Sequence, residues 1–217
     1  MPKRTRRVAL KPRKLPVQPR SADTVAAILE AAARILERDG LAGYNTNAVA
    51  GLAGVSIGSL YQYFPNKDAL IAALIERETA VLLGELKGVT AEVSFQVGMR
   101  RMIRAAIAHQ LRRPALARLL DFEEQRLPLG ARNERVSQTI ATIVVALLGW
   151  PGAPRTANKP VIALDLLAIV KGMVDAAGQR GETDSVALQR RVERAVEGYL
   201  GSYSLASPTQ GESDPQR

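Results

Sequence analysis

Apolar side chains recur every three or four residues along most of the chain, and this spacing predicts a succession of amphipathic α-helices. One face of the first predicted helix, residues 22–39, is formed by Val25, Ile28, Leu29, Ala32, Ile35 and Leu36. Ser21 is suited to cap its beginning, and Gly40 is suited to end it. We find no alternating strand pattern and no repeat of fixed period. The sequence therefore predicts an all-α fold.

Three further helices are predicted to follow closely and to complete a small unit. The Asn45-Thr46-Asn47 run offers a cap for a short helix that ends at Gly54. Ser56 caps a third helix, which must stop before Pro65 because proline moves its predecessor out of the helical region. Asn66 then caps a fourth, more apolar helix.

Longer helices are predicted beyond residue 88, over residues 90–112, 115–126, 131–149, 159–180 and 184–203, which makes about nine helices in all. We expect four parts: a disordered basic arm over residues 1–20, a small helical unit over 21–81, a larger helical unit over 88–203, and a disordered tail over 204–217. The tail is rich in Ser, Pro, Gly and Gln, a composition that does not support a packed core.

Positive charge is concentrated at the beginning of the chain. Of a net charge of +9 at pH 7, eight basic side chains and no acids lie within residues 1–20, so the rest is almost balanced. Four prolines prevent a continuous helix there. The arm is either a solvated tail, a transit peptide weakened by its prolines, or a flexible segment that contacts nucleic acid.

The composition excludes several classes of function. The 217 residues contain no cysteine and one histidine, so disulfides, thiolate chemistry, a histidine-based metal site and a catalytic triad are not expected. No phosphate-binding loop of the G-x-x-x-x-G-K-[ST] kind is present. No apolar run is long enough to cross a membrane. We expect a soluble cytoplasmic protein without cofactor or metal.

Residues 45–64 have the form of a helix-turn-helix, two short helices joined by a tight turn at Gly54. In such a motif the second helix enters the major groove of DNA. Gly58 costs that helix about 1 kcal/mol relative to alanine, which indicates close approach of its backbone to a partner. Lys67 lies in the first turn of the next helix, where the helix dipole disfavours a cation but a bound phosphate favours one. Lys67 could equally be a solvated lysine.

The pattern Thr46-x-x-Val49-Ala50-x-x-Ala53-Gly54-Val55-Ser56-x-Gly58-x-Leu60-Tyr61-x-Tyr63-Phe64-x-x-Lys67-x-x-Leu70 resembles the DNA-binding domain of the TetR/AcrR family of bacterial transcriptional regulators. The resemblance covers residues 21 to about 80. It implies that Thr46 caps the second helix and touches a phosphate. The DNA-binding residues we predict are Arg20, Thr46, Asn47, Ser56, Ile57, Gly58, Ser59, Tyr61, Gln62, Tyr63 and Lys67.

The resemblance also implies a homodimer built on the last two helices. Residues 159–180 are apolar nearly all round, so this helix must be covered on two sides. The interface residues we predict are Leu164, Leu167, Lys171, Val174, Val192, Val196 and Tyr199. The alternative is that both helices belong to the core of one protomer.

The family resemblance further implies an effector pocket, which we place among residues 90–149. The lining residues we predict are Met99, Met102, Ile103, Phe122, Glu123, Thr139 and Ile143, with His109 and Gln110 as further polar candidates. Each apolar residue could instead be ordinary core, and residues 121–126 could be a solvated helix face.

The function predicted from the sequence is that of a ligand-responsive homodimeric regulator, most simply a repressor. It would bind a palindromic operator on double-stranded DNA and be released by a small apolar or amphipathic effector. One alternative is a constitutive DNA-binding architectural or adaptor protein without an effector. Another is an enzyme with a DNA-binding head, which the lack of catalytic residues disfavours.

Overall fold

The computed structural model describes residues 10, 12, 19–91, 94–156 and 158–204, and this part of the chain folds into nine α-helices and one short 3-10 helix. The helices are α1 (Pro19–Gly43), α2 (Thr46–Leu52), α3 (Ile57–Tyr63), α4 (Lys67–Lys87), η1 (Gly88–Ala91), α5 (Phe95–Leu111), α6 (Pro114–Arg126), α7 (Gly130–Leu147), α8 (Lys159–Gln179) and α9 (Ser185–Ser204). The all-α prediction is confirmed. Most of the predicted arm and tail lies outside the described residues.

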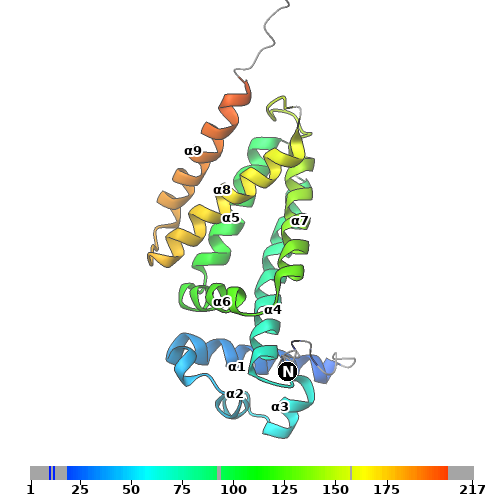
Figure 1. Ribbon diagram of the computed structural model, residues 1–217, viewed down its shortest axis with the longest axis vertical. Coiled ribbons are helices and arrows are strands. Elements are labelled where there is room, and N and C mark those ends of the chain that lie inside the picture. Colours follow the sequence, from blue (N-terminus) through cyan, green and yellow to red (C-terminus); the bar gives the residue numbers. More distant parts are fainter. Residues whose placement is uncertain (1–9, 11, 13–18, 92–93, 157, 205–217) are drawn as a thin grey trace, which may run out of the picture.

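The molecule has a small head and a larger body joined by α4 (Figure 1). The head comprises α1, α2, α3 and the first half of α4. The body comprises α5, α7, α8 and α9, together with the second half of α4. Helix α6 lies crosswise between the two parts (Figure 1).

Side-chain caps fix where the short helices of the head begin. The side-chain oxygens of Asn45, Ser56 and Asn66 accept hydrogen bonds from the backbone N–H groups of Ala48, Ser59 and Ala69, at 2.9, 3.0 and 2.8 Å. The caps predicted at Ser56 and Asn66 are confirmed. The cap predicted at Thr46 is wrong, because Thr46 is the first helical residue of α2 and its neighbour Asn45 supplies the capping oxygen.

The core of the head receives residues from α6 as well as from its own helices. Leu60 and Phe64 are fully buried there, in one apolar cluster with Ile28 and Leu36 of α1. Leu116 and Leu120 of α6 belong to the same apolar cluster. The helix predicted at residues 115–126 therefore packs one face on the head, although the sequence placed it in the larger unit.

The second core lies in the body and is built mainly from α5, α7, α8 and α9. Helix α5 begins at Phe95, later than predicted, because residues 88–91 form the separate turn η1. Helix α7 ends before a tight turn in which Gly152 has a φ of 82°, a conformation that favours glycine.

Candidate nucleic-acid interface and internal cavity

Helices α2 and α3 form a helix-turn-helix with an outward polar face. Gly54 adopts a φ of 68° in the turn, and the Val55 N–H donates to the carbonyl of Ala50 at 3.0 Å. Leu60 faces the core, so the other side of α3 is presented to solvent. Its exposed residues are Ser56, Ile57, Gly58, Tyr61 and Gln62, with Ser59 half-buried beside them.

Gly58 has no intramolecular reason to be glycine. A Cβ added at this position would contact only the Ser56 Oγ, at the ordinary distance of 3.8 Å. The helix loses stability at this position without gaining any packing in return. The missing side chain instead leaves the backbone of α3 open to close approach from outside.

The Thr46 and Tyr61 hydroxyl groups lie 3.1 Å apart, within hydrogen-bonding distance, and join α2 to α3. The Tyr61 side chain would otherwise be free to rotate, since 40% of the residue is exposed. The contact holds both hydroxyls at one edge of the outward face, and Asn47 is exposed next to Thr46. This arrangement fits two groups that bind one phosphate oxygen each.

Lys67 is the first residue of α4, and its side chain is exposed. Its carbonyl oxygen accepts a hydrogen bond of 3.1 Å from the buried Tyr44 hydroxyl, which anchors this end of α4 to the head. Asp68 pairs with Arg126 of α6 at 2.6 Å, so this carboxylate is already engaged with another cation. Tyr63 is half-buried against the head core. Arg20 lies in the first turn of α1.

The body contains a cavity of about 220 Å³ that opens between α4, α5, α6, α7 and α8. At the end next to α6 its lining includes Thr79, His109, Asp121, Glu124, Arg132 and Asp175. Farther from α6 the same helices contribute Leu82, Leu86, Met99, Met102, Ile140 and Leu166. The cavity thus has apolar walls and one polar end.

The polar end carries a set of charged contacts. The Asp121 carboxylate accepts a hydrogen bond of 2.9 Å from Gln110, which is itself buried. Arg132 donates to Glu124 at 3.3 Å, and Lys171 donates to Asp175 at 2.5 Å. Partial burial raises the pKa of the Asp121 and Glu124 carboxyls above their ordinary values.

His109 also lines the polar end, and burial lowers the pKa of its imidazole. This ring is therefore more readily neutral than an exposed histidine. A smaller cavity of about 50 Å³ adjoins these residues and is lined on its other side by Glu78 and Arg113.

The structure places two of the seven predicted effector-binding residues, Met99 and Met102, in the cavity wall. Ile103 is buried in the body core and Ile143 is half-buried against it, and neither lines the cavity. These two positions share the helical periodicity of the lining residues, but their side chains belong to the packed core of the body.

The remaining three assignments are also corrected by the structure. Phe122 is 59% exposed and lies outside the lining. Glu123 is buried, but it turns away from the cavity and binds Arg126 at 2.5 Å. Thr139 is exposed, and its hydroxyl donates to the carbonyl of Arg135.

Sequence reasoning missed the charged lining residues Asp121, Glu124, Arg132 and Asp175, and it assigned Lys171 to another site. A signal was present in residues 159–180, since Lys171 and Asp175 interrupt an otherwise very apolar helix at a spacing of four residues. Charged residues on such a helix need a polar environment, which solvent supplies to the exposed Lys171 and the polar end of the cavity supplies to Asp175.

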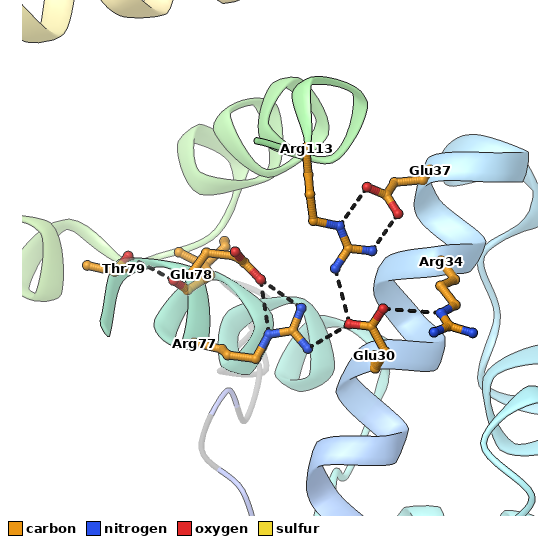
Figure 2. Close-up of polar contacts among 8 residues, drawn as sticks. Glu30, Arg34, Glu37, Arg77, Glu78, Thr79 and Arg113 are labelled. Atoms are coloured by element: carbon orange, nitrogen blue, oxygen red, sulfur yellow. Dashed lines mark hydrogen bonds and ion pairs between the residues drawn. The ribbon is translucent and has the colours of Figure 1, made fainter. Parts of the chain in front are cut away.

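An ion cluster joins α6 to the head beside the smaller cavity, which Glu78 and Arg113 line (Figure 2). Arg113 donates to both carboxylate oxygens of Glu37, at 2.7 and 2.5 Å, and to Glu30 at 3.1 Å. Glu30 also accepts from Arg77 of α4, at 3.3 Å, and Arg77 pairs with Glu78 at 2.7 Å. Helices α1, α4 and α6 therefore meet in one charged network.

The predicted pairing residues fall into three groups. Val174, Val192 and Val196 are buried within the protomer, so their assignment to an exposed partner surface is corrected. Their periodicity reflects contacts of α8 and α9 with the body core. Leu167 and Lys171 line the cavity.

A second face of α8 remains uncovered. Leu164 is 52% exposed and Val161 is 47% exposed, and Ala168 continues this stripe one turn further on. Tyr199 of α9 lies half-buried beside it, and its hydroxyl donates to Asp165. The apolar surface available to a partner is thus narrower than the sequence predicted.

None of the helices in the described part of the chain is long and apolar enough to span a membrane. The described residues also contain no group of three or more His, Cys, Asp or Glu side chains that could hold a metal ion.

Comparison with known proteins agrees with this architecture. Residues 28–74 match the family model for bacterial regulatory proteins of the tetR family, and residues 95–200 match the tetracyclin repressor-like C-terminal domain. A solved TetR-family regulator from Mesorhizobium loti superposes with a TM-score of 0.68 at 20% identity, covering 86% of this chain and 99% of that one. A TetR regulator from Haloarcula marismortui gives 0.71 at 16% identity, covering 84% and 98%. These likenesses establish the fold.

Sequence relatives are regulators as well. An HTH-type transcriptional regulator of Mycobacterium tuberculosis is 33% identical over 138 residues, which are 61% of this chain and 66% of the relative. The nucleoid occlusion factor SlmA of Salmonella typhi is 28% identical over 156 residues, covering 68% of this chain and 79% of that protein. The match thus spans just under two thirds of the mycobacterial relative. With both family models matched in chain order on the head and the body, the chain belongs to the TetR family of bacterial transcriptional regulators, which bind DNA and are not enzymes.

Proposed function

We propose that this regulator is a homodimeric repressor that binds a palindromic operator and is released by a small amphipathic effector. In this proposal α3 enters the major groove, where Ser56, Ile57 and Ser59 face base edges and Gly58 permits close approach. Thr46, Tyr61 and Lys67 bind phosphates. The protein would work in the cytoplasm, where chromosomal DNA is found.

The observation that carries the proposal is that α6 contacts both the cavity and the head. Asp121 and Glu124 line the cavity, whereas Arg113 and Arg126 bind Glu37 of α1 and Asp68 of α4. A ligand that displaces α6 must therefore disturb contacts that position the head. A regulator without an effector would need neither this connection nor a cavity of about 220 Å³.

Pairing in the proposal uses the exposed stripe of Val161, Leu164 and Ala168 on α8 together with α9. Two large aliphatic side chains exposed one turn apart on a helix are best explained by a partner that covers them. Dimerisation would present two α3 helices to successive turns of one face of the duplex, about 34–36 Å apart or a multiple of that.

A second candidate function is DNA binding without a small effector, as in an architectural or adaptor protein. It is favoured by the similarity to proteins described as nucleoid occlusion factors. Under this reading the cavity is a packing defect of the body, and nothing that fills it changes the affinity for DNA.

The experiment that tests the proposal has two steps. Selection from random duplexes should yield a palindromic site for the wild-type chain and no enriched site for Gly58→Val. A metabolite and drug panel, scored by thermal shift, should then yield a compound that also weakens binding to that site. A bound compound with no effect on DNA affinity would favour the second candidate, and failure to enrich a palindrome would overturn the proposal.

A further inference from the structure

We infer that the cavity takes a cationic amphiphile, an apolar body with a protonated amine or similar basic group that binds Asp121. This inference deepens the proposed function and rests on its assignment of the cavity as the effector site. It is supported by the distribution of polar and apolar residues in the cavity lining and by the pairing of the charges there.

Along four helices the lining changes in the same direction, from polar residues near α6 to apolar residues farther away. On α5, His109 lies at the α6 end and Met102 lies farther away, and on α8 Asp175 and Leu166 are arranged in the same order. Helices α4 and α7 repeat the pattern. A ligand that fills the cavity must therefore be amphipathic, with its polar group toward α6.

The sign of the charge on the ligand's polar group follows from the charges of the residues that line the cavity. Among the lining residues the carboxylates of Asp121, Glu124 and Asp175 outnumber the cations of Arg132 and Lys171. Since burial disfavours protonation of His109, that ring does not offset the difference. The polar end has an excess of one negative charge when all three acids are ionised.

Both cations are already engaged. Lys171 binds Asp175 at 2.5 Å. Arg132 binds Glu124, the Thr79 hydroxyl at 2.7 Å and the Ile75 carbonyl at 3.2 Å. An anionic ligand would therefore have to share each cation with the carboxylate that already binds it.

Asp121 is the carboxylate left without a cationic hydrogen-bond partner among the described residues. Its hydrogen bond comes from the neutral amide of Gln110. Burial raises the pKa of this carboxyl and the nearby Asp175 raises it further, whereas the Gln110 hydrogen bond and the charges of Lys171 and His109 lower it. The net change is upward, so its charged form is only partly compensated. A neutral ligand that expelled water from the cavity would increase this penalty, whereas a cation would remove it.

The size of the cavity sets the size of the ligand. A volume of about 220 Å³ holds on the order of ten water-sized groups. A chain of about eight carbons with a terminal amine has this size. Octylamine, octanol and octanoate therefore form a matched probe series that differs only in the charge and hydrogen bonding of the polar group.

The test is calorimetric titration of the full-length chain with these three probes at pH 7. Octylamine should bind most tightly and octanoate most weakly. Asp121→Asn keeps the shape of the side chain and should weaken octylamine binding by about ten- to a hundredfold, the range for a charge-assisted hydrogen bond. It should leave octanol unchanged. Glu134→Gln, which neutralises an exposed acid of α7 outside the cavity lining, is the matched control and should change neither.

One further variant tests whether the probes bind in the cavity, and one further measurement tests whether the Asp121 variant is folded. Ala106→Leu narrows the apolar part of the cavity and should weaken octylamine and octanol alike. A thermal unfolding curve shows whether Asp121→Asn remains folded; if it does not, Asp121→Ser removes the same carboxylate and has the same expected pattern.

Octanoate binding as tightly as octylamine, no octylamine binding at millimolar concentration, or unchanged octylamine affinity in the folded variants would each overturn the inference. These outcomes leave the proposed function standing, because they do not involve DNA. Conversely, octylamine that binds as expected but leaves DNA affinity unchanged counts against the proposed regulation and not against the ligand class.

Discussion

Replacing Arg113 by methionine removes the guanidinium that joins α6 to α1 while keeping most of the side-chain volume. Its two nitrogens bind both oxygens of Glu37, at 2.7 and 2.5 Å, and a third binds Glu30 at 3.1 Å. The Arg113 and Glu37 side chains are 24% and 28% exposed, so their pair is largely shielded from water. Glu30 is 39% exposed, so its contact with Arg113 contributes less to stability than the contact with Glu37.

A bidentate, partly buried pair of this kind contributes about 1.5–3 kcal/mol to stability. We expect Arg113→Met to lower the free energy of unfolding by about 2 kcal/mol. For a chain of this size that corresponds to a decrease of about 4–8 °C in the melting temperature. Part of the loss comes from leaving Glu37 without its partner.

The neighbouring arginine is the matched control. Arg112 binds Glu85 at 2.5 Å, but the two side chains are 46% and 37% exposed and both belong to the body side of the molecule. Exposed pairs contribute about 0–1 kcal/mol. Arg112→Met should therefore change the melting temperature much less than Arg113→Met and should leave regulation unchanged.

The functional assay compares DNA affinity with and without a saturating cavity ligand. Arg113→Met should still bind the ligand, because Arg113 lies outside the cavity of about 220 Å³, but the ligand should weaken its DNA binding less than in the wild type. Equal melting temperatures for the two variants would refute the energetic argument. A wild-type ligand effect in Arg113→Met would refute the claim that this contact couples the cavity to the head.

The pH dependence provides a second check, on the contact of Arg113 with Glu30. Partial burial alone would raise the pKa of Glu30, but hydrogen bonds from Arg34 and Arg113 and the charges of Arg113 and Arg77 hold it below its ordinary value. Such a carboxylate stabilises the fold fully above its unfolded-state pKa, near 4.3, and loses this contribution as the pH falls through the lower folded-state pKa. The stability difference between the wild type and Arg113→Met should therefore shrink below about pH 4.

Three further predictions concern the surfaces used by DNA and by a partner. Lys67→Ala should weaken operator binding and lower the salt slope by about 0.9, the value for one phosphate contact, whereas Lys159→Ala, at the same position of a body helix, should not. Leu164→Glu should give a monomer in sedimentation at micromolar concentration, while Val81→Glu, a similarly exposed site on α4, should remain a dimer; a dimeric Leu164 variant would contradict the proposed interface. Deleting residues 2–19 should reduce affinity for operator and random duplexes alike and flatten the salt dependence, and an unchanged slope would identify the arm as a solvated tail.

The head was predictable because its determinants are local. A cap such as Ser56 or Asn66 acts within three residues, and Pro65 ends a helix by contact with its immediate neighbour. The turn at Gly54 requires a positive φ that glycine adopts readily. Such signals do not depend on the rest of the fold, so the sequence alone places the helix-turn-helix to within a residue or two.

The surroundings of the body helices were not predictable in the same way. Helical periodicity shows that one face is buried, but it does not identify the helix that covers it. Val192 and Val196 therefore fit an interface and a protomer core equally well on sequence, and the structure buries both in the core. Ile103 and Met102 are adjacent apolar residues, and only Met102 reaches the cavity.

Helix α6 was the hardest to place from the sequence because its faces contact different parts of the molecule. Leu116 packs on the head core, while Asp121 lies in the cavity wall, and Arg113 and Arg126 bind the head from the two ends of the helix. Its sequence is that of an ordinary amphipathic helix with a charged outer face. The role of each charge depends on the side chains of other helices that contact it, and the sequence of α6 does not show these contacts.

The energies on the two faces of α6 are of similar size, which makes a switch feasible. A ligand shifts a conformational equilibrium only by its difference in affinity for the two states, and coupling between sites amounts to about 1–3 kcal/mol in typical allosteric proteins. The Arg113–Glu37 pair contributes about 2 kcal/mol. One charge-assisted hydrogen bond from a cationic ligand to Asp121 contributes about 1.5–3 kcal/mol. If that bond forms fully only when α6 has moved, a single contact in the cavity supplies enough free energy to break the pair that fixes the helix to the head.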